Sequence, residues 1–546
     1  MAKKTKFVFI VGGVMSGIGK GVVTSSIGKN IQARKGTIDL IKIDPYLNID
    51  AGTMNPIQHG EVFVTDDGGE IDVDFGHYAR ILGLNMKKSQ NITTGKVYRE
   101  VIRKERAGDY LGQTVQVIPH ITDEIKKRIR EVVELRNPDV LLIEVGGTVG
   151  DMESQPFLEA IRQMIMEEKR EDTLLVHTTF VPVPVHLGEP KTKPTQHSVK
   201  ELRSIGLNPK IIVCRSHDVL DEQILEKVAL FCNVPKEAVF TLPDLDTVYS
   251  APYLLDQQGF GELIIEELKL DVEKVEWKEW NELTERFENP KDCVKIAMGG
   301  KYTTIVDSYI SVNEALKHAA AFFKFGVEID WIDTEEIEQD KNKVKIMDEY
   351  DGLLVPGGFG YRGTEGKITM ICHARENNIP FLGLCFGFQL ATVEFSRNVL
   401  GVKDASSFEF TMNGDVKSKN LVIDLLPEQK RVTDLGGTMR LGGLKVLIKK
   451  GTNTHRLYKK DLIVERHRHR FEVNPDFIER IEKKGLVFAG TSEDGRRMEI
   501  FELPGHRFFQ ASQFHPEFTS LPWNPNPLFR GFIEAAIDRQ KERLKT

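Results

Sequence analysis

Cysteine is scarce in this sequence of 546 residues. Its five cysteines, at positions 214, 232, 293, 372 and 385, are scattered, and no two form a CxxC pair. An odd, scattered set argues against a disulfide framework and indicates a reducing compartment, so we expect a cytoplasmic protein. The same spacing argues against a structural zinc site.

Long apolar runs are also missing. No uncharged apolar run approaches the roughly 18 residues that a membrane span needs, so we expect no membrane partner. The short apolar stretch 7–11 runs directly into a glycine loop, and no small-residue cleavage pattern follows it. It therefore predicts a buried first strand rather than a signal peptide.

There is no excess of basic charge. The 74 basic and 81 acidic residues give a net charge of −7, which argues against a general nucleic-acid binder. The apolar share of 40% and the charged share of 28% exclude a largely disordered chain. At roughly 100–200 residues per domain, the chain is expected to form more than one.

Apolar runs alternate with amphipathic stretches in both halves, which predicts α/β architecture. A charged, helical stretch near 268–293, broken by Asn289-Pro290, marks a domain boundary. Before it we expect a helix over 20–35 and strands at 7–11, 39–43, 140–145, 173–181, 210–214 and 238–242. After it we expect strands starting at 294 and 352, and at 379–384, 498–503 and 508–514.

The segment 12–21, GGVMSGIGKG, follows the first strand and opens a helix. Glycines there let backbone N–H groups point at phosphate, and lysine neutralises the outer phosphates. The match is imperfect, because Val14 replaces the usual first glycine and Gly21 the usual Ser/Thr. A tight turn without a ligand is the alternative.

Because that hydroxyl is missing, magnesium on a nucleotide must find oxygen ligands elsewhere. Glu70, Asp72 and Asp74 alternate and would share one face of a strand. Glu144 ends an apolar strand, where ligands bind in open parallel sheets. We favour metal binding for Asp74 and Glu144, whereas a solvated strand face is an equal alternative for Glu70 and Asp72.

Two further clusters have polar residues suited to a ligand. Lys191 and Lys193 lie in a proline-fixed loop and can aim at one anionic group; a solvated loop is the alternative. Asp151 and Glu153 can accept hydrogen bonds from a base or sugar, or can equally be acids at a helix N-terminus.

The second half has a cysteine in a nucleophile elbow. The segment 383–389, GLCFGFQ, follows an apolar strand and opens a helix, so its glycines permit a turn that exposes Cys385. The helix N-terminus lowers a thiol pKa, and Gly357-Gly358 can offer a second oxyanion donor. In extended backbone at 514–517, Glu517 would hold His515 while His515 faces Cys385.

The run Arg466-His-Arg-His-Arg470 suggests nucleic-acid binding, but five residues in an acidic protein are weak support. Alternation places Arg466, Arg468 and Arg470 on one face. We therefore favour an arginine that binds a carboxylate or phosphate.

With these motifs in order, the chain resembles the CTP synthase family over nearly its whole length. The motifs are GGV at 12–14 with GKG at 19–21, KIDPY at 42–46, QHGEVF at 58–63 and KTKPTQHSVKE at 191–201. The resemblance implies two doubly wound α/β domains. These are a P-loop-like amidoligase (synthetase) domain over 1–270 and a class I glutamine amidotransferase domain over 294–546, joined by a linker over 271–293.

The family reaction implied by the resemblance is the last step of de novo CTP synthesis. ATP phosphorylates the uracil 4-oxygen of UTP, and ammonia from glutamine displaces the phosphate. GTP would activate and CTP would inhibit. The resemblance also implies a homotetramer built as a dimer of dimers, with filaments compatible with it. Bulk ammonia is mostly protonated near neutral pH, so a shielded passage is the physical requirement.

The family pattern implies roles for these positions. ATP would contact Gly17, Ile18, Gly19, Lys20, Gly21, Val22, Lys42, Asp74, Pro243, Asp244 and Leu245, and Mg²⁺ would sit on Asp74 and Glu144. UTP or CTP would contact Ser16, Asp151, Met152, Glu153, Lys191, Thr192, Lys193, Pro194, Thr195, Gln196 and Lys227. Cys385, His515 and Glu517 would be catalytic, and glutamine would contact Gly358, Phe386, Gly387, Phe388, Gln389, Glu409 and Arg470. His59 would line the ammonia passage, and Arg440 would contact GTP.

Two other hypotheses are compatible with parts of the sequence. Another ATP-dependent amidoligase would use a different acceptor, but the lysine-rich loop at 191–200 suits a triphosphate. A scaffold or filament subunit with degenerate sites would need no triad, but Cys385, His515 and Glu517 are all present.

Overall fold

The computed structural model describes residues 4–54, 60–184, 186, 188–300, 306–425 and 439–545. The chain forms two compact units. The first comprises Met1–Thr53 and His77–Glu288, and the second comprises Met54–Gly76 and Asn289–Thr546. The short segment from the N-terminal half therefore belongs to the second unit.

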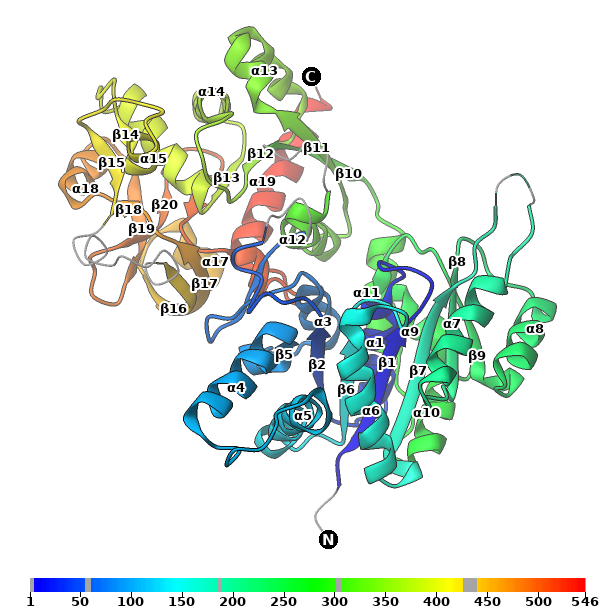
Figure 1. Cartoon of the computed structure of the whole chain (residues 1–546). Helices are drawn as coiled ribbons and strands as arrows, with labels where there is room; N and C mark the ends of the chain where they lie inside the picture. The colour runs from blue at the N-terminus through cyan, green and yellow to red at the C-terminus, as the bar shows by residue number, and fades with distance from the viewer. Residues whose placement is uncertain are drawn as a thin grey trace. The chain divides into compact units, whose positions relative to one another are not determined.

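The first unit is built on a seven-stranded sheet with the order β5-β2-β6-β1-β7-β8-β9, and every pairing in it is parallel (Figure 1). Its strands are β1 (Lys6–Gly12), β2 (Ile38–Asp44), β5 (Asn91–Thr93), β6 (Val140–Val145), β7 (Thr173–Phe180), β8 (Ile211–Ser216) and β9 (Val239–Pro243). The central strands β6, β1 and β7 are buried along almost their whole length and are mostly apolar, because helices cover both faces of the sheet. The strands expected in this half are confirmed.

The helices of this unit divide between the two faces. Side chains of α4 (Thr94–Ala107), α5 (Thr122–Arg136) and α6 (Gln155–Glu167) join one core with β1, β2 and β6. Helix α1 (Lys20–Gln32) packs with α9 (Ala251–Asp256) and α10 (Phe260–Leu268). The other helices are α7 (Lys193–Ser204), α8 (Glu222–Cys232) and α11 (Lys278–Glu288). This is the predicted doubly wound arrangement.

The acidic segment 70–74 differs from the prediction of one strand. Strand β4 (Glu70–Ile71) ends before Asp72, and α3 (Asp74–Leu82) begins two residues later. The Asp72 Oδ1 atom accepts the backbone N–H of Asp74 at 3.3 Å. Such a local bond starts a helix and competes with a strand ladder, so the three acids do not share a strand face.

The second unit has a nine-stranded mixed sheet with the order β11-β10-β12-β13-β21-β20-β19-β16-β17 (Figure 1). Its parallel part comprises β11 (Gly326–Asp333), β10 (Cys293–Gly300), β12 (Gly352–Val355), β13 (Phe381–Leu384) and β21 (Phe509–Ser512). Its antiparallel part adds β20 (Met498–Glu502), β19 (Val487–Ser492), β16 (Arg440–Ile448) and β17 (Leu462–His469).

Helices cover both faces of this sheet too. One apolar core includes α14 (Thr364–Glu376) and α15 (Phe386–Asn398), and the other includes α12 (Ile310–Phe322) and α19 (Pro527–Arg543). The shorter helices are α13 (Thr334–Gln339), α16 (Phe408–Met412), α17 (Asn453–Tyr458) and α18 (Pro475–Glu482). Two small sheets contain β14 (Ser406–Ser407), β15 (Leu421–Asp424) and β18 (Glu472–Val473), and the hairpin of β3 (Phe63–Val64) with β4. Among the described residues, no helix combines the length and apolar character of a membrane span.

Candidate functional site

The glycine loop of the first unit lies between β1 and α1. Val14, Gly17 and Gly19 have φ angles of 77°, 76° and 85°, a left-handed conformation that glycine adopts without strain. Lys20 is 7% exposed, and its ammonium donates to the Gly147 carbonyl at 2.6 Å. The loop thus opens a helix at the carboxyl end of a central strand, where parallel sheets bind phosphate.

An arginine that sequence reasoning missed ties this loop to the end of β9. Arg215 is the penultimate residue of β8, and its Nε donates to the Ile18 carbonyl at 3.2 Å. Its Nη1 donates to the Pro243 carbonyl, and its Nη2 bonds Asp244 at 2.9 Å. The side chain thus joins two segments expected to contact ATP. A single arginine near the end of a strand carries no spacing signal, so the sequence could not reveal this role.

The Glu144 carboxylate, near the end of β6, accepts hydrogen bonds from three buried side chains. Its Oε1 accepts from Lys42 at 2.6 Å, and its Oε2 accepts from Thr24 at 2.7 Å and Tyr78 at 2.6 Å. Glu144 and Lys42 are 1% and 3% exposed. Mg²⁺ prefers oxygen ligands such as carboxylates, so Glu144 is a suitable type of residue for a magnesium site. In this structure, the Lys42 ammonium rather than a metal ion neutralises the charge of Glu144.

The residues expected to contact UTP lie mostly at the start of α7. Lys193 bonds Gln196 at 3.0 Å, and Gln196 bonds Thr192 at 3.0 Å. The Lys193 ammonium lies 5.4 Å from the ring centre of Phe231, in the same helix, α8, as Lys227.

Polar contacts link other candidates of this unit to their local surroundings. Lys191 pairs with Glu189, and Asp151 accepts the Thr148 hydroxyl at 2.8 Å. Asp151 thus stabilises the turn that begins at Thr148, whereas the Met152 side chain is exposed. His59, the residue expected along the ammonia passage, lies outside the described residues.

Cys385 occupies a strained turn between β13 and α15. Its φ of 48° and ψ of −93° are unusual for a residue with a side chain, and such strain is typical of functional positions. A Cβ on Gly387 would lie 2.2 Å from the Val355 carbonyl oxygen, so only glycine fits there. The strand–turn–helix geometry predicted for the elbow is confirmed.

His515 and Glu517 form a hydrogen-bonded pair, Nδ1 to Oε1, at 2.7 Å. The extended backbone predicted for them is wrong, because a 3₁₀ turn, Pro516–Thr519, begins at the proline and brings the two side chains together. A Cβ on Gly357 would lie 2.9 Å from His515 Cε1 and 3.8 Å from Cys385 Cβ, so ring and thiol converge there. Burial lowers the pKa of His515, but the Glu517 carboxylate and the Cys385 sulfur raise it well above its ordinary value. The ring is therefore suited to hold a proton beside a thiolate.

The residues expected to bind glutamine divide between backbone and side-chain positions. The Phe386 and Phe388 side chains point into the core, so only their backbone can meet a ligand. Glu409 Oε1 accepts the Gly360 N–H at 2.7 Å, near Gly358. Gln389 donates to the Phe471 carbonyl at 3.2 Å, next to Arg470.

Two of the arginines in the 466–470 run bind protein carboxylates. Arg466 bonds Asp66 and Arg468 bonds Glu70, each at 2.7 Å. Both acids belong to the hairpin of β3 and β4, within the same unit. Glu70 is thus neither the solvated residue nor the metal ligand considered from sequence, because its carboxylate neutralises an arginine.

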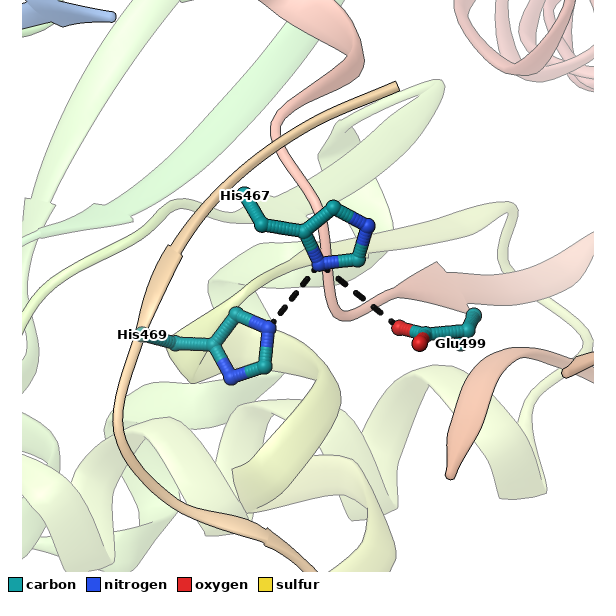
Figure 2. A group of neighbouring side chains, drawn as sticks. All are labelled: His467, His469 and Glu499. Atoms are coloured by element: carbon teal, nitrogen blue, oxygen red, sulfur yellow. Dashed lines mark hydrogen bonds and ion pairs between the residues drawn. The ribbon is translucent and has the colours of Figure 1, made fainter. Parts of the chain in front are cut away.

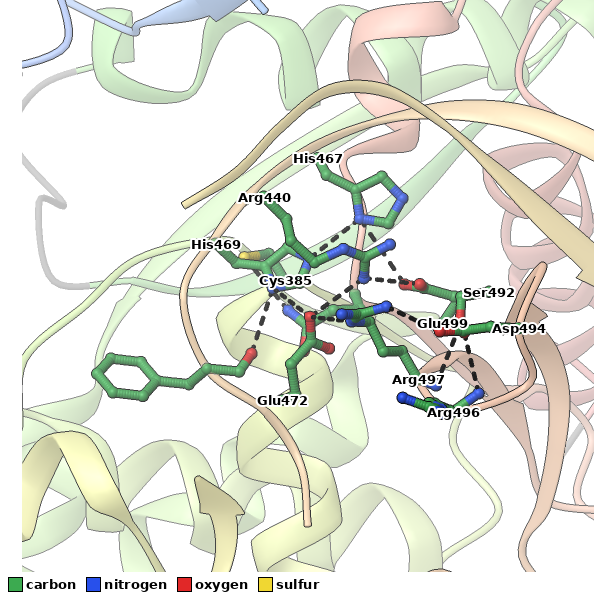
Figure 3. Close-up of polar contacts among 12 residues, drawn as sticks. Cys385, Arg440, His467, His469, Glu472, Ser492, Asp494, Arg496, Arg497 and Glu499 are labelled. Atoms are coloured by element: carbon green, nitrogen blue, oxygen red, sulfur yellow. Dashed lines mark hydrogen bonds and ion pairs between the residues drawn. The ribbon is translucent and has the colours of Figure 1, made fainter. Parts of the chain in front are cut away.

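Arg440, the expected GTP contact, lies in a buried polar network (Figure 3). Its Nη1 bonds Glu499 at 2.7 Å and Glu472 at 3.1 Å. Burial and the neighbouring Glu499 carboxylate raise the pKa of Glu472 above its ordinary value, although Arg440 lowers it. His467 and His469 complete the network, and sequence reasoning missed both because it considered only the arginine face of the run.

The two units together define a class of protein. One is a doubly wound unit with a phosphate-type glycine loop, and the other carries a cysteine, histidine and glutamate set on a class I amidotransferase-type sheet. The family description "CTP synthase N-terminus" matches residues 6–270, and "Glutamine amidotransferase class-I" matches residues 304–535.

Curated relatives cover the whole chain. The CTP synthase of Pyrococcus abyssi is 55% identical over 99% of this chain and 100% of its own length. That of Pyrococcus furiosus is 54% identical over the same shares. A solved glutaminase domain of Trypanosoma brucei CTPS with bound acivicin is 38% identical, covering 45% of this chain and 94% of its own, with a TM-score of 0.42. The chain belongs to the CTP synthase family.

Proposed function

We propose that this chain converts UTP to CTP with ATP, using ammonia that it releases from glutamine. The observation that carries this conclusion is the identity to curated CTP synthases over 99% of the chain, with both halves of the reaction represented. The enzyme is a glutamine-hydrolysing C–N ligase. Residues 1–270 would be its synthetase domain, 271–293 its linker and 294–546 its amidotransferase domain.

The synthetase half would bind both nucleotides. The loop 17–22 with Lys20 would hold the ATP phosphates, and Lys42 would lie near the transferred phosphoryl group. Residues 191–196, with Ser16 and Lys227, would hold UTP, and residues 243–245 would contact adenine. A magnesium ion on Asp74 and Glu144 would neutralise phosphate charge. Lys42 would then be released from Glu144.

The amidotransferase half would hydrolyse glutamine through Cys385. The Cys385 sulfur attacks the amide carbon, and His515 carries the thiol proton to the departing ammonia. Glu517 orients the ring, as its 2.7 Å bond to Nδ1 supports. Water then cleaves the thioester, with His515 as the base. Backbone N–H groups after Cys385 and at Gly358 would stabilise the oxyanion.

Regulation and assembly follow the family expectation. GTP would activate glutamine use, with Arg440 as its contact, and CTP would inhibit through residues 151–153. His59 would lie along the ammonia passage. The assembly would be a homotetramer, compatible with filaments, in the cytoplasm, where its nucleotide substrates and reduced thiols are found.

The test measures CTP formation by ultraviolet absorbance from UTP, ATP and magnesium, with glutamine or with ammonia, and with or without GTP. The parent chain should form CTP from both nitrogen sources. Cys385→Ala should lose the glutamine-dependent activity and keep the ammonia-dependent one, while Cys293→Ala serves as the control. No CTP from either source, with folded protein, would refute the proposal. If Cys385→Ala lost both activities, the assignment of chemistry to the two halves would be wrong.

A further inference from the structure

Two histidines on β17 form a buried hydrogen-bonded column beside Cys385 (Figure 3). His467 and His469 are 0% and 5% exposed. The Nδ1 atom of His467 lies 3.0 Å from the Nε2 atom of His469. The Nδ1 atom of His469 lies 3.2 Å from the Phe471 carbonyl oxygen.

These contacts define which nitrogen carries each proton. A carbonyl only accepts, so His469 Nδ1 must carry a proton and donate it to Phe471. His469 Nε2 then accepts, and His467 Nδ1 donates to it. Burial, together with nearby positive charge, lowers the pKa of both rings well below its ordinary value. Both rings are therefore neutral, with one proton each.

The column ends on the corner that joins β17 to β18. The Phe471 carbonyl at this corner accepts from Gln389 as well as from His469, each at 3.2 Å. The Arg468 carbonyl, at its other end, accepts from the Cys385 thiol at 3.8 Å. Arg470 lies between them. The corner thus touches the nucleophile and carries a residue proposed to bind glutamine.

The side chains of His467, His469 and Glu499 are better suited to hydrogen bonding with one another than to binding a metal ion. Ligand atoms of His467, His469 and Glu499 lie within 4.8 Å of one another, with His467 Nδ1 between the other two (Figure 2). However, Arg440 already bonds Glu499 at 2.7 Å and brings a positive charge beside the cluster. A divalent cation would be repelled by this guanidinium.

We propose that His469, held in one tautomer by His467, is a positioning residue for glutamine hydrolysis. Its N–H bond to Phe471 fixes the corner that carries Arg470 and the Arg468 carbonyl. The inference rests on the proposed function and adds to it a residue that need not touch the substrate.

The test uses two substitutions that each replace only one of the two ring nitrogens of His469. In His469→Asn the amide N–H stands near the position of Nδ1 and can still reach Phe471. In His469→Gln it stands near Nε2 and cannot. Losing one hydrogen bond to a buried carbonyl should raise KM for glutamine about 10-fold to 100-fold in His469→Gln. His469→Asn should change it less than about 3-fold, and ammonia-dependent CTP formation should equal that of the parent in both.

The same logic gives a second pair of variants. His467→Asn keeps a donor near Nδ1 and should behave like the parent, whereas His467→Gln should raise KM for glutamine. His506→Asn is the matched control, because His506 Nε2 contacts the Ala374 carbonyl in α14 at 3.1 Å, away from the corner. It should leave KM for glutamine unchanged.

Labelling of Cys385 by a glutamine-mimicking electrophile makes the test independent of CTP synthesis. The labelling rate should fall in His469→Gln and not in His469→Asn. Equal KM and equal labelling in the two variants would show a merely structural histidine and overturn the inference. About one zinc per purified chain, lost in both variants, would also overturn it. A parent that labels as expected but forms no CTP would refute the proposed function instead.

Discussion

Glu465, on β17, makes the stability of this protein depend on pH in an unusual direction. It is 3% exposed. Its carboxylate accepts from Tyr458 at 3.0 Å, Asn526 at 2.9 Å and Thr519 at 2.7 Å. Burial raises its pKa from 4.5 to about 7, although the three donors lower it. Desolvation of the charge therefore outweighs three hydrogen bonds.

The sign follows from proton binding. Between pH 4.5 and about 7 the folded protein holds this proton and the unfolded chain does not. The contribution of Glu465 to the unfolding free energy is thus fully present below pH 4.5 and lost as pH rises through 7. At about 1.4 kcal/mol per pH unit, the loss amounts to about 3 kcal/mol.

Glu465→Gln removes the titration and keeps the shape, because an amide can still meet all three partners. As pH rises from mildly acidic to mildly alkaline, we expect the unfolding free energy of the variant to increase by about 3 kcal/mol relative to that of the parent. Guanidinium unfolding of both proteins across this range, at constant ionic strength, measures the difference. Parallel stability curves would refute the argument, since the other buried carboxyls titrate equally in both proteins and cancel.

Two further predictions concern Lys42 and the thiols. Lys42→Met leaves the Glu144 carboxylate buried without its cation, so we expect the unfolding free energy measured by calorimetry to fall by about 3–5 kcal/mol. Ammonia-dependent CTP formation should also be lost. An unchanged melting temperature would contradict this prediction. Burial raises the pKa of Cys232 to about 11 and that of Cys372 to about 12, so a glutamine-mimicking electrophile should label Cys385 first, as read by peptide mass. Equal labelling of all five cysteines would contradict the role of Cys385.

Much of the fold and of the elbow could be predicted from local sequence. The strand at 140–145 is apolar except for Glu144 because both of its faces are covered, so composition alone identified it. The turn at Cys385 was predictable because glycines on both sides of a nucleophile have a single steric purpose. In both cases the information lies within a few residues.

What could not be predicted depends on contacts between distant segments. The charge state around Glu144 is set by Lys42, Thr24 and Tyr78, which come from three other elements. The segment 70–74 was misassigned because an alternating acidic pattern fits a strand face, whereas a single side-chain bond from Asp72 starts a helix. Neither feature leaves a spacing signal in the sequence.

The hairpin of β3 and β4 comes from the N-terminal half of the sequence but belongs to the second unit. Its Asp66 and Glu70 neutralise Arg466 and Arg468, and its Phe63 ring packs edge-on against Phe518 at 5.2 Å between ring centres. A gene cut between the two matched family regions would take these groups from the C-terminal product and leave two arginines without their carboxylates. The second unit is thus not a contiguous stretch of the sequence. A C-terminal fragment that is to keep both ion pairs would have to include Met54–Gly76 as a separate segment.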